Sequence, residues 1–239
     1  MKKYTFLFLI FGLLAACESP DVCTDNCANK RIRFIDDGVN FNRIIYDDNN
    51  RQINYIKGIV SASTYSYNGL NAQKTQGNDL TTYVLNDGLV PDFSLVTSSV
   101  ASSSNLTNSY SYDAAGQLIY SSETQVPQVI NYSHTWQNGN LILTSFKRQT
   151  GNITTYIKYE YYTDITNSLG NKFVGLQLFG KSSKNAVKRI TKSFSNGNPM
   201  IINTFEYKKD LCGCITHSKE TDNSNVVTEK TYIYEKIVE

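Results

Sequence analysis

The sequence is poor in the residues on which many enzyme centres depend. It has two histidines, one tryptophan and four prolines among 239 residues. A catalytic triad or a histidine-ligated metal would have to use His134 or His217, which lie in strand-like stretches rich in tyrosine or serine. Nucleophile-elbow, His-Glu-x-x-His and phosphate-loop motifs are absent. We therefore expect a protein without enzymatic activity, cofactor or bound metal.

An excess of charge of one sign is also lacking. Lys2 and Lys3 belong to the leader discussed below, and residues 1–16 contain no acid. The totals of 23 basic and 21 acidic side chains therefore become 21 and 21 in the remaining chain. Nucleic-acid-binding proteins usually carry a basic excess. We expect no nucleic-acid partner.

The longest apolar run covers residues 4–14 and is shorter than the about 20 residues that a spanning helix needs. Two lysines precede it and small residues follow it, as in a secretory signal. The stretch Leu14-Ala15-Ala16-Cys17 resembles the lipobox of bacterial lipoproteins. This resemblance implies cleavage before Cys17, lipidation of that cysteine and attachment to a membrane.

We therefore divide the chain into a signal peptide (1–16), a tether (17–30) and one all-β, repeat-like domain (31–239). Residues 18–29 contain three acids and neither lysine nor arginine. Such an acidic start is similar to the export tether of surface lipoproteins in some Gram-negative bacteria. We expect a lipid-anchored outer-membrane protein and favour the outer surface over the periplasmic side. The alternative is a solvated linker that faces the periplasm.

Strand-forming residues alternate with turn residues over the rest of the chain. Tyrosine (17) and phenylalanine (11) are frequent, and Asn, Asp and Gly clusters separate the apolar stretches. Asp-Gly and Asn-Gly pairs favour hairpins because glycine readily adopts a positive φ. The expected fold is a single antiparallel meander of hairpins that forms an open twisted or partly curled sheet. Strands are predicted at residues 31–35, 41–46, 52–56, 64–67, 83–85, 110–112, 117–120, 129–136, 141–146, 153–162, 187–194, 200–207 and 226–237.

Two stretches interrupt this rhythm. Residues 94–111 are dense in Ser, Thr and Asn, which favours a loop over a polar edge strand. Residues 163–185 contain Gly170, Gly175 and Gly180, and we expect them to wrap around or cross the sheet. Neither stretch indicates a domain boundary.

Three segments resemble the tyrosine-aspartate (YD/RHS-like) hairpin repeat of large secreted proteins. Residues 110–119 (YSYDAAGQLI) carry the frame best, and residues 205–215 repeat it with the Asp and Gly spaced differently. A looser copy runs from Tyr46 to Ile53. Residues 179–188 (FGKSSKNAVK) add a resemblance to uncharacterised Gram-negative outer-membrane lipoproteins with such repeats. The resemblance implies an antiparallel sheet on a lipid tether and offers no catalytic residues.

Four cysteines remain after Cys17, and an oxidising compartment favours disulfides between them. Cys212 and Cys214 are too close in sequence to join without strain. We therefore expect Cys23 and Cys27 to pair with these two, in either arrangement. A four-thiolate zinc site is the alternative, although the spacings are not those of common zinc knuckles.

Charged clusters have two interpretations each. The pairs Asp36-Asp37 and Asp47-Asp48 could bind calcium, but aspartate is also favoured in turns. A cationic stretch could meet lipid phosphates or an acidic glycan, or it could keep an exposed edge strand soluble, which we favour. This stretch contains Lys181, Lys184, Lys188, Arg189 and Lys192.

Tyrosines of two strand-like segments form the candidate binding face, on which exposed rings could stack on sugar or peptide. Cross-strand packing is the alternative. The expected function is a non-enzymatic surface module that binds glycan or envelope protein. The alternatives are an envelope-assembly factor that cradles lipid or a nascent membrane protein, and a hydrolase that uses two carboxylates. The candidate residues are Tyr156, Tyr159, Tyr161, Tyr232 and Tyr234.

Overall fold

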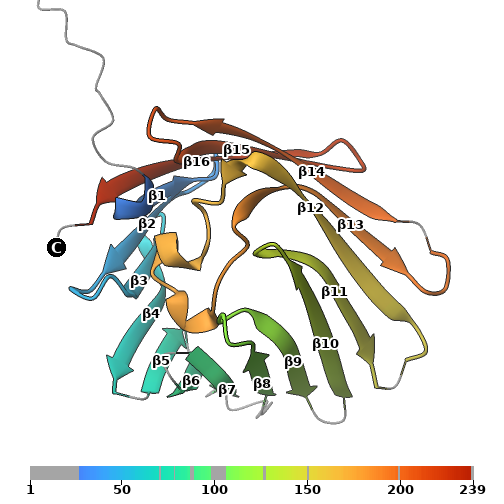
Figure 1. The fold of residues 1–239 in the computed structure, drawn as a ribbon. Helices are drawn as coiled ribbons and strands as arrows, with labels where there is room; N and C mark the ends of the chain where they lie inside the picture. The colour runs from blue at the N-terminus through green and yellow to red at the C-terminus, as the bar shows by residue number, and fades with distance from the viewer. Residues whose placement is uncertain are drawn as a thin grey trace, which may run out of the picture.

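Antiparallel strands make up most of the described chain, as Figure 1 shows for the computed structural model. The structure describes residues 27–69, 71–77, 79–86, 89–97, 106–125, 128–149, 151–198 and 200–237. The first eight strands are β1 (Lys30–Asp36), β2 (Phe41–Tyr46), β3 (Gln52–Lys57), β4 (Val60–Asn68), β5 (Asn71–Gln76), β6 (Asp79–Asn86), β7 (Leu89–Thr97) and β8 (Leu106–Tyr112). The others are β9 (Leu118–Gln125), β10 (Gln128–Gln137), β11 (Asn140–Arg148), β12 (Thr154–Thr166), β13 (Asn185–Phe194), β14 (Ile201–Lys209), β15 (Ile215–Asp222) and β16 (Val227–Lys236).

The helical elements of the described chain are three short 3₁₀ turns. They are η1 (Cys27–Asn29), η2 (Asn171–Val174) and η3 (Gln177–Phe179). Among the described residues, no helix has the length and apolar character needed to cross a membrane.

Each strand pairs with the strand that follows it in the chain, which confirms the antiparallel meander. The sheet curls until β1 pairs with β16, from Lys30 opposite Lys236 to Asp36 opposite Thr231. Because β1 also pairs with β2, the strand order closes on itself as a barrel. The curled form of the expected sheet is therefore the observed one.

Three strands escaped the sequence prediction. β5 has one apolar residue, Ala72, which is fully buried, so the inner side of this strand needs no larger side chain. β7 and β15 were also missed, and the loop predicted over residues 94–111 was wrong where β7 and β8 occupy it. Serine and threonine form strands here because neighbouring strands satisfy their backbone groups on both sides.

The three segments that resemble hairpin repeats share one turn geometry. In each, an aspartate Oδ1 accepts the backbone N–H four residues later, and its own N–H donates to that residue's carbonyl. The residue three positions after the aspartate has a positive φ. A fourth turn of this kind, which starts at Asp222, was not predicted. The turns run 47–51, 113–117, 210–214 and 222–226.

The register separates an inner from an outer face. Residues directly opposite each other in an antiparallel pair lie on the same face. One such row runs through aromatic residues and crosses β8 to β13, whereas the adjacent row is polar. The first row is Tyr110, Ser121, Tyr132, Phe146, Thr155 and Phe194, and the second is Ser109, Ser122, Asn131, Lys147 and Thr154.

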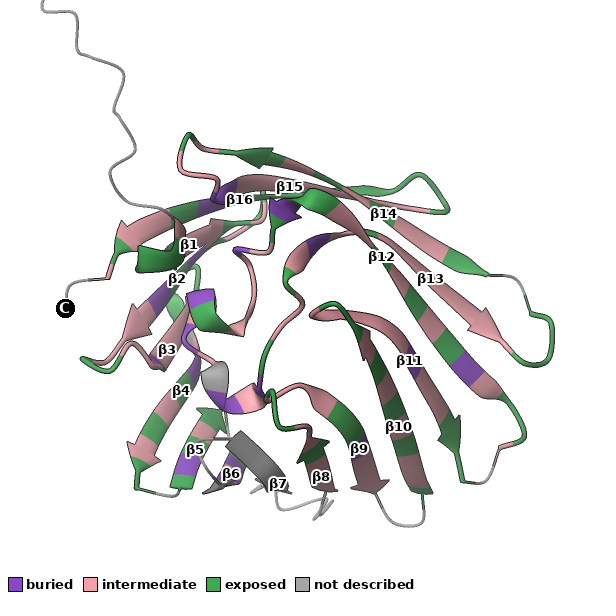
Figure 2. Cartoon of the chain, in the orientation of Figure 1, coloured by how far each residue is buried: buried purple, intermediate pink, exposed green. Residues whose placement is uncertain are grey.

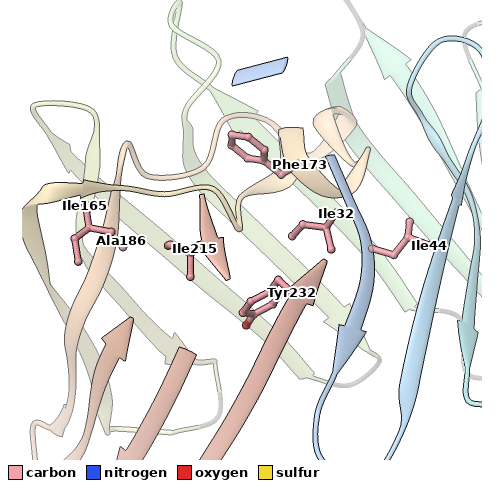
Figure 3. Packing of buried hydrophobic residues seen from close by; sticks show 7 residues of the cluster. All are labelled: Ile32, Ile44, Ile165, Phe173, Ala186, Ile215 and Tyr232. Atoms are coloured by element: carbon pink, nitrogen blue, oxygen red, sulfur yellow. The ribbon is translucent and has the colours of Figure 1, made fainter. Parts of the chain in front are cut away.

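The aromatic row lies on the inside of the curl. Tyr110 packs against the cluster of Ala72, Tyr83 and Leu178, and Leu178 belongs to the segment that lies within the curl in Figure 1. Most buried positions gather where this segment meets the sheet, as Figure 2 shows. The larger core cluster, drawn in Figure 3, comprises Ile32, Ile44, Ile165, Phe173, Ala186, Ile215 and Tyr232.

Candidate functional site

Residues 167–184, here called the inner segment, leave β12 and cross the inside of the curled sheet before β13 begins (Figure 1). This confirms the crossing predicted for residues 163–185. Phe173 places the segment in the larger core cluster and Leu178 in the smaller one. Backbone hydrogen bonds join it to three turns: Gln52 N donates to Gly175 O, Lys181 N to Gly116 O, and Lys184 N to Gly139 O.

These contacts define two different ends of the sheet. In a meander, successive turns alternate between the two ends. The turns at 47–51, 113–117, 138–139 and 210–214 therefore share one end, which we call the covered end because the inner segment lies against the first three of them. The turns at 37–40, 58–59 and 223–226, together with the connections from β11 to β12 and from β13 to β14, lie at the opposite, far end.

A pocket of about 930 Å³ lies at the covered end, between the inner segment and the turn that joins β8 to β9. Its size is within the range of small-molecule sites. Two of its glycines permit close approach. Gly180 has φ +82°, and a Cβ there would lie 2.7 Å from the Tyr112 ring, while a Cβ at Gly170 would lie 2.7 Å from Ser182 Cβ. The lining comprises residues 113–116, Thr166, Asn167, residues 170–173 and residues 180–184.

Several neutral polar side chains of this lining already have partners within the protein. Ser182 Oγ accepts the N–H of Asn171, whose side-chain amide donates to Gly180 O. Asn167 donates to Ser183 O and accepts the N–H of Leu169. These hydrogen bonds stabilise the inner segment and leave few neutral donors for a ligand.

Charged groups of the lining remain exposed to solvent. Lys172, Lys181 and Lys184 are exposed, and no carboxylate of the described chain lies within ion-pair distance of their ammonium groups. Asp113 Oδ1 is occupied by the backbone N–H groups of Ala115 and Gln117. The pocket therefore carries three cations and one acid that caps its own turn.

The cationic stretch is not an edge strand, which corrects the favoured prediction. β13 pairs with both β12 and β14, because it lies between these two strands in the meander and therefore has no free edge. Arg189 lies 3.9 Å from Glu160, and Lys188 lies over the Tyr162 ring. Only Lys181 and Lys184 of this stretch reach the pocket. Lys172 was not singled out because no neighbouring charge marks it in the sequence.

The five candidate tyrosines do not form one exposed surface. Tyr156 is exposed, whereas Tyr159 and Tyr161 occupy the half-buried positions of the same strand. Tyr161 donates to Leu141 O at 2.5 Å. Tyr232 shares a hydrogen bond with Ser218, and Tyr234 donates to Ile215 O. Internal hydrogen bonds of this kind support the packing interpretation for the last three.

Burial also changes the chemistry of the inner tyrosines. Desolvation raises the pKa of Tyr46, Tyr67, Tyr207 and Tyr234 far above the usual value of 10. Their hydroxyls therefore remain neutral donors at any physiological pH. Tyr67 donates to Gln52 O, and Tyr46 bonds to the carbonyl of Ile32.

A disulfide joins Cys27 to Cys214, with 5.2 Å between their Cα atoms and a sequence separation of 187. This confirms the predicted joining of the N-terminal and C-terminal cysteines for one pair. Cys212 is disulfide-bonded as well. Because Cys27, Cys212 and Cys214 are oxidised, they are not the thiolate ligands of the alternative zinc site. Cys17 and Cys23 lie outside the described residues.

His134 lies on the inner face of β10. Its Nδ1 is 3.0 Å from Thr144 Oγ1, and its Nε2 is 3.3 Å from Ser121 Oγ. Desolvation lowers the pKa of this histidine. Its described partners are hydroxyl groups, which makes His134 part of a polar contact between three strands. His217 lies on β15, opposite Lys208 and Thr231.

Aspartates of both acidic pairs accept hydrogen bonds within the turns in which they lie. Asp37 Oδ1 accepts the N–H groups of Val39 and Asn40, and these bonds lower the pKa of Asp37. Asp47 accepts the N–H of Asn49 and bonds to the Arg51 guanidinium. No group of three or more potential metal ligands occurs among the described residues. The turn interpretation of these aspartates accounts for their contacts.

Exposed apolar side chains ring the far end of the sheet. Ile59 is 100% exposed, Val39 87% and Val60 65%. We call this set the apolar rim. It lies on the end opposite Cys27 and the inner segment. Its members are Val39, Phe41, Ile59, Val60, Leu80, Ile153, Met200, Ile201, Val226 and Val227.

No protein-family model and no curated protein matches the chain. Solved structures do share its fold. A porin-like protein from Bacteroides uniformis matches with a TM-score of 0.66 at 14% identity, over 85% of this chain and 96% of its own. A porin-like protein from Bacteroides vulgatus gives 0.64 at 12% identity, over 86% and 99%. At these identities the similarity establishes the architecture alone.

Proposed function

We propose that the protein is a non-enzymatic lipoprotein of the outer membrane, anchored through Cys17, whose curled sheet stands in water and binds a glycan or an envelope protein. The observation that carries this proposal is the polarity of the sheet. Aromatic side chains line its inside, and polar side chains cover most of its outside.

β10 and β12 illustrate this polarity. The half-buried positions of β10 include Tyr132 and His134, whereas its exposed positions are Gln128, Asn131, Ser133, Thr135 and Gln137. On β12, Lys158 and Glu160 are exposed. A sheet that spans a membrane presents an apolar band outward, and a lysine at mid-bilayer on that face costs about 2–4 kcal/mol. The outer face of this sheet suits water, although its architecture is porin-like.

The position of the first described residues supports a tether at the covered end. Cys27 is joined there to Cys214, and Lys30 forms an ion pair with Asp210 of the same turn at 3.6 Å. Cys17 precedes Cys27 by ten residues, which reach at most about 35 Å when fully extended. A lipid on Cys17 would keep the covered end near the membrane and the apolar rim away from it.

Cell fractionation of a Cys17→Ala variant tests this proposal. The substitution removes the lipid acceptor but leaves small residues suited to ordinary signal cleavage. We expect the variant to be released as a water-soluble protein, whereas a Glu18→Ala control stays with the membrane and carries acyl groups. Retention of the Cys17→Ala protein in carbonate-washed membranes would show that the sheet itself is embedded. Protease shaving of intact cells distinguishes the outer surface from the periplasmic side.

The apolar rim favours a second function, that of an envelope-assembly factor which holds a nascent membrane protein. Exposed apolar patches often mark interaction sites. We expect the protein to suppress aggregation of an unfolded outer-membrane protein. A Val39→Asn/Ile59→Asn variant should lose this effect, whereas Leu211→Asn, an 80% exposed position at the covered end, should retain it. Equal activity of both variants would exclude the rim as the binding surface.

A further inference from the structure

We infer that the pocket at the covered end binds a phosphate group, supplied either by a membrane phospholipid or by a soluble phosphate ester. This inference deepens the proposed function, because the lipid source requires the anchor at Cys17. Three features of the pocket support phosphate binding: the chemistry of its lining, its apolar wall and its place in the fold.

The available donors on the pocket wall are cationic. Lys172, Lys181 and Lys184 line the pocket, while the side chains of Asn167, Asn171 and Ser182 form hydrogen bonds within the inner segment. A ligand must therefore offer acceptors for ammonium groups. Lysine is a compact point charge that binds phosphate well, and several lysines around one site suit an anion with more than one charged oxygen.

The backbone fixes two of these lysines relative to the opposite wall. Lys181 N donates to Gly116 O at 2.9 Å, and Lys184 N donates to Gly139 O at 2.8 Å. Each lysine is thus held at its backbone against a turn between two strands, while its ammonium group stays exposed. This arrangement reduces the entropy lost when the ligand binds, because the chain segment is already ordered.

Part of the pocket wall is apolar. Ala114, Ala115 and the buried Phe173 contribute to the lining. A phosphate attached to glycerol or an acyl chain can use this wall, whereas a free inorganic ion cannot. The pocket also lies at the end that carries Cys27, so a lipid-anchored chain would bring it close to head groups.

The test uses the mature protein purified in nonionic micelles, with micelles that contain phosphatidylglycerol or phosphatidylcholine, and with soluble glycerol 1-phosphate. The readout is the acetylation rate of each lysine, measured by mass spectrometry. We expect phosphatidylglycerol to slow acetylation of Lys172, Lys181 and Lys184 severalfold. Three exposed lysines elsewhere, Lys57, Lys147 and Lys158, should change less than twofold.

The measurements with phosphatidylglycerol and with glycerol 1-phosphate distinguish a lipid from a soluble source of phosphate. Protection by glycerol 1-phosphate assigns a soluble ester, and protection by phosphatidylglycerol alone assigns a lipid. Uniform protection of all six lysines, or protection of none, overturns the inference. The intact mass of the same sample reports whether Cys17 carries acyl chains. Acylation without protection therefore rejects the pocket alone, and protection without acylation rejects the anchor alone.

Matched charge variants provide a second measurement. Substituting Lys172, Lys181 and Lys184 by glutamine should weaken binding to phosphatidylglycerol micelles about a hundredfold, because each lysine near an anionic surface contributes about fivefold. The control substitutes Lys57, Lys147 and Lys158 by glutamine and removes the same charge. It should lose less than fivefold. Equal losses would indicate nonspecific attraction and overturn the inference. Unchanged unfolding midpoints in both variants establish that they fold.

Discussion

Replacement of Gly175 by alanine is expected to displace the inner segment from the sheet. Gly175 is buried with φ +70°, and its carbonyl accepts the N–H of Gln52. A Cβ at this position would lie 2.6 Å from Gln52 N and 2.9 Å from Asn50 O. Both contacts are with backbone atoms, one in the β2–β3 turn and one at the start of β3, so no side-chain rotation relieves them.

The expected loss combines two terms. A left-handed backbone costs a non-glycine residue about 1–2 kcal/mol. Movement of the segment also breaks the hydrogen bond to Gln52, which contributes about 1 kcal/mol, and loosens the packing around Phe173. We expect Gly175→Ala to lower the free energy of unfolding by about 3 kcal/mol or more. For a domain of this size, the melting temperature would fall by about 10 °C.

Gly197→Ala is the matched control. Gly197 has φ +78° in the β13–β14 turn, but a Cβ there meets nothing within 4 Å. The free energy of unfolding of Gly197→Ala should therefore fall only by the cost of the left-handed backbone, about 1 kcal/mol. Chemical denaturation of both variants, together with proteolysis of the inner segment, provides the assay. If the two variants agree within 1 kcal/mol, the packing of the segment against the β2–β3 turn does not stabilise the fold as argued.

Three further predictions concern the disulfide and the inner face. Replacing Cys27 and Cys214 by alanine should lower the free energy of unfolding by at most about 5 kcal/mol, and no measurable loss would contradict the chain-entropy argument. Because burial lowers the pKa of His134, stability should fall as the pH drops below 6.5, and His134→Gln should flatten that slope. Burial raises the pKa of Tyr46 and Tyr234, so alkaline ultraviolet titration should show tyrosines that ionise only on unfolding, with stability decreasing above pH 10.

Local sequence patterns predicted the strands and turns well where apolar residues alternate. The range 41–46 coincides with β2, and Asp113 begins the turn on which the repeat resemblance depends. β5 was missed because its inner face lies against Tyr67 and Tyr83, whose rings fill the space beside Ala72. A strand whose inner positions hold a small residue shows no alternation of large apolar and polar residues, so its sequence does not predict a strand.

The candidate site was less accessible to sequence reasoning. Lys181 and Lys184 were recognised as a cationic stretch, but Lys172 and the wall at Ala114 and Ala115 were not connected with them. The glycines predicted that residues 163–185 cross the sheet, yet nothing in the sequence indicates which turns they meet. Hydrogen bonds to Gly116 and Gly139 determine that choice, and both are long-range contacts.

By itself the sequence determined an antiparallel all-β chain, because alternation and turn residues act over a few neighbouring residues. Only the tertiary structure decided that the sheet curls until β1 meets β16, that tyrosines such as Tyr46, Tyr67 and Tyr234 are largely buried, and that three lysines line one pocket. These features depend on the summed twist of successive strands and on contacts between residues far apart in the chain, which no local pattern encodes.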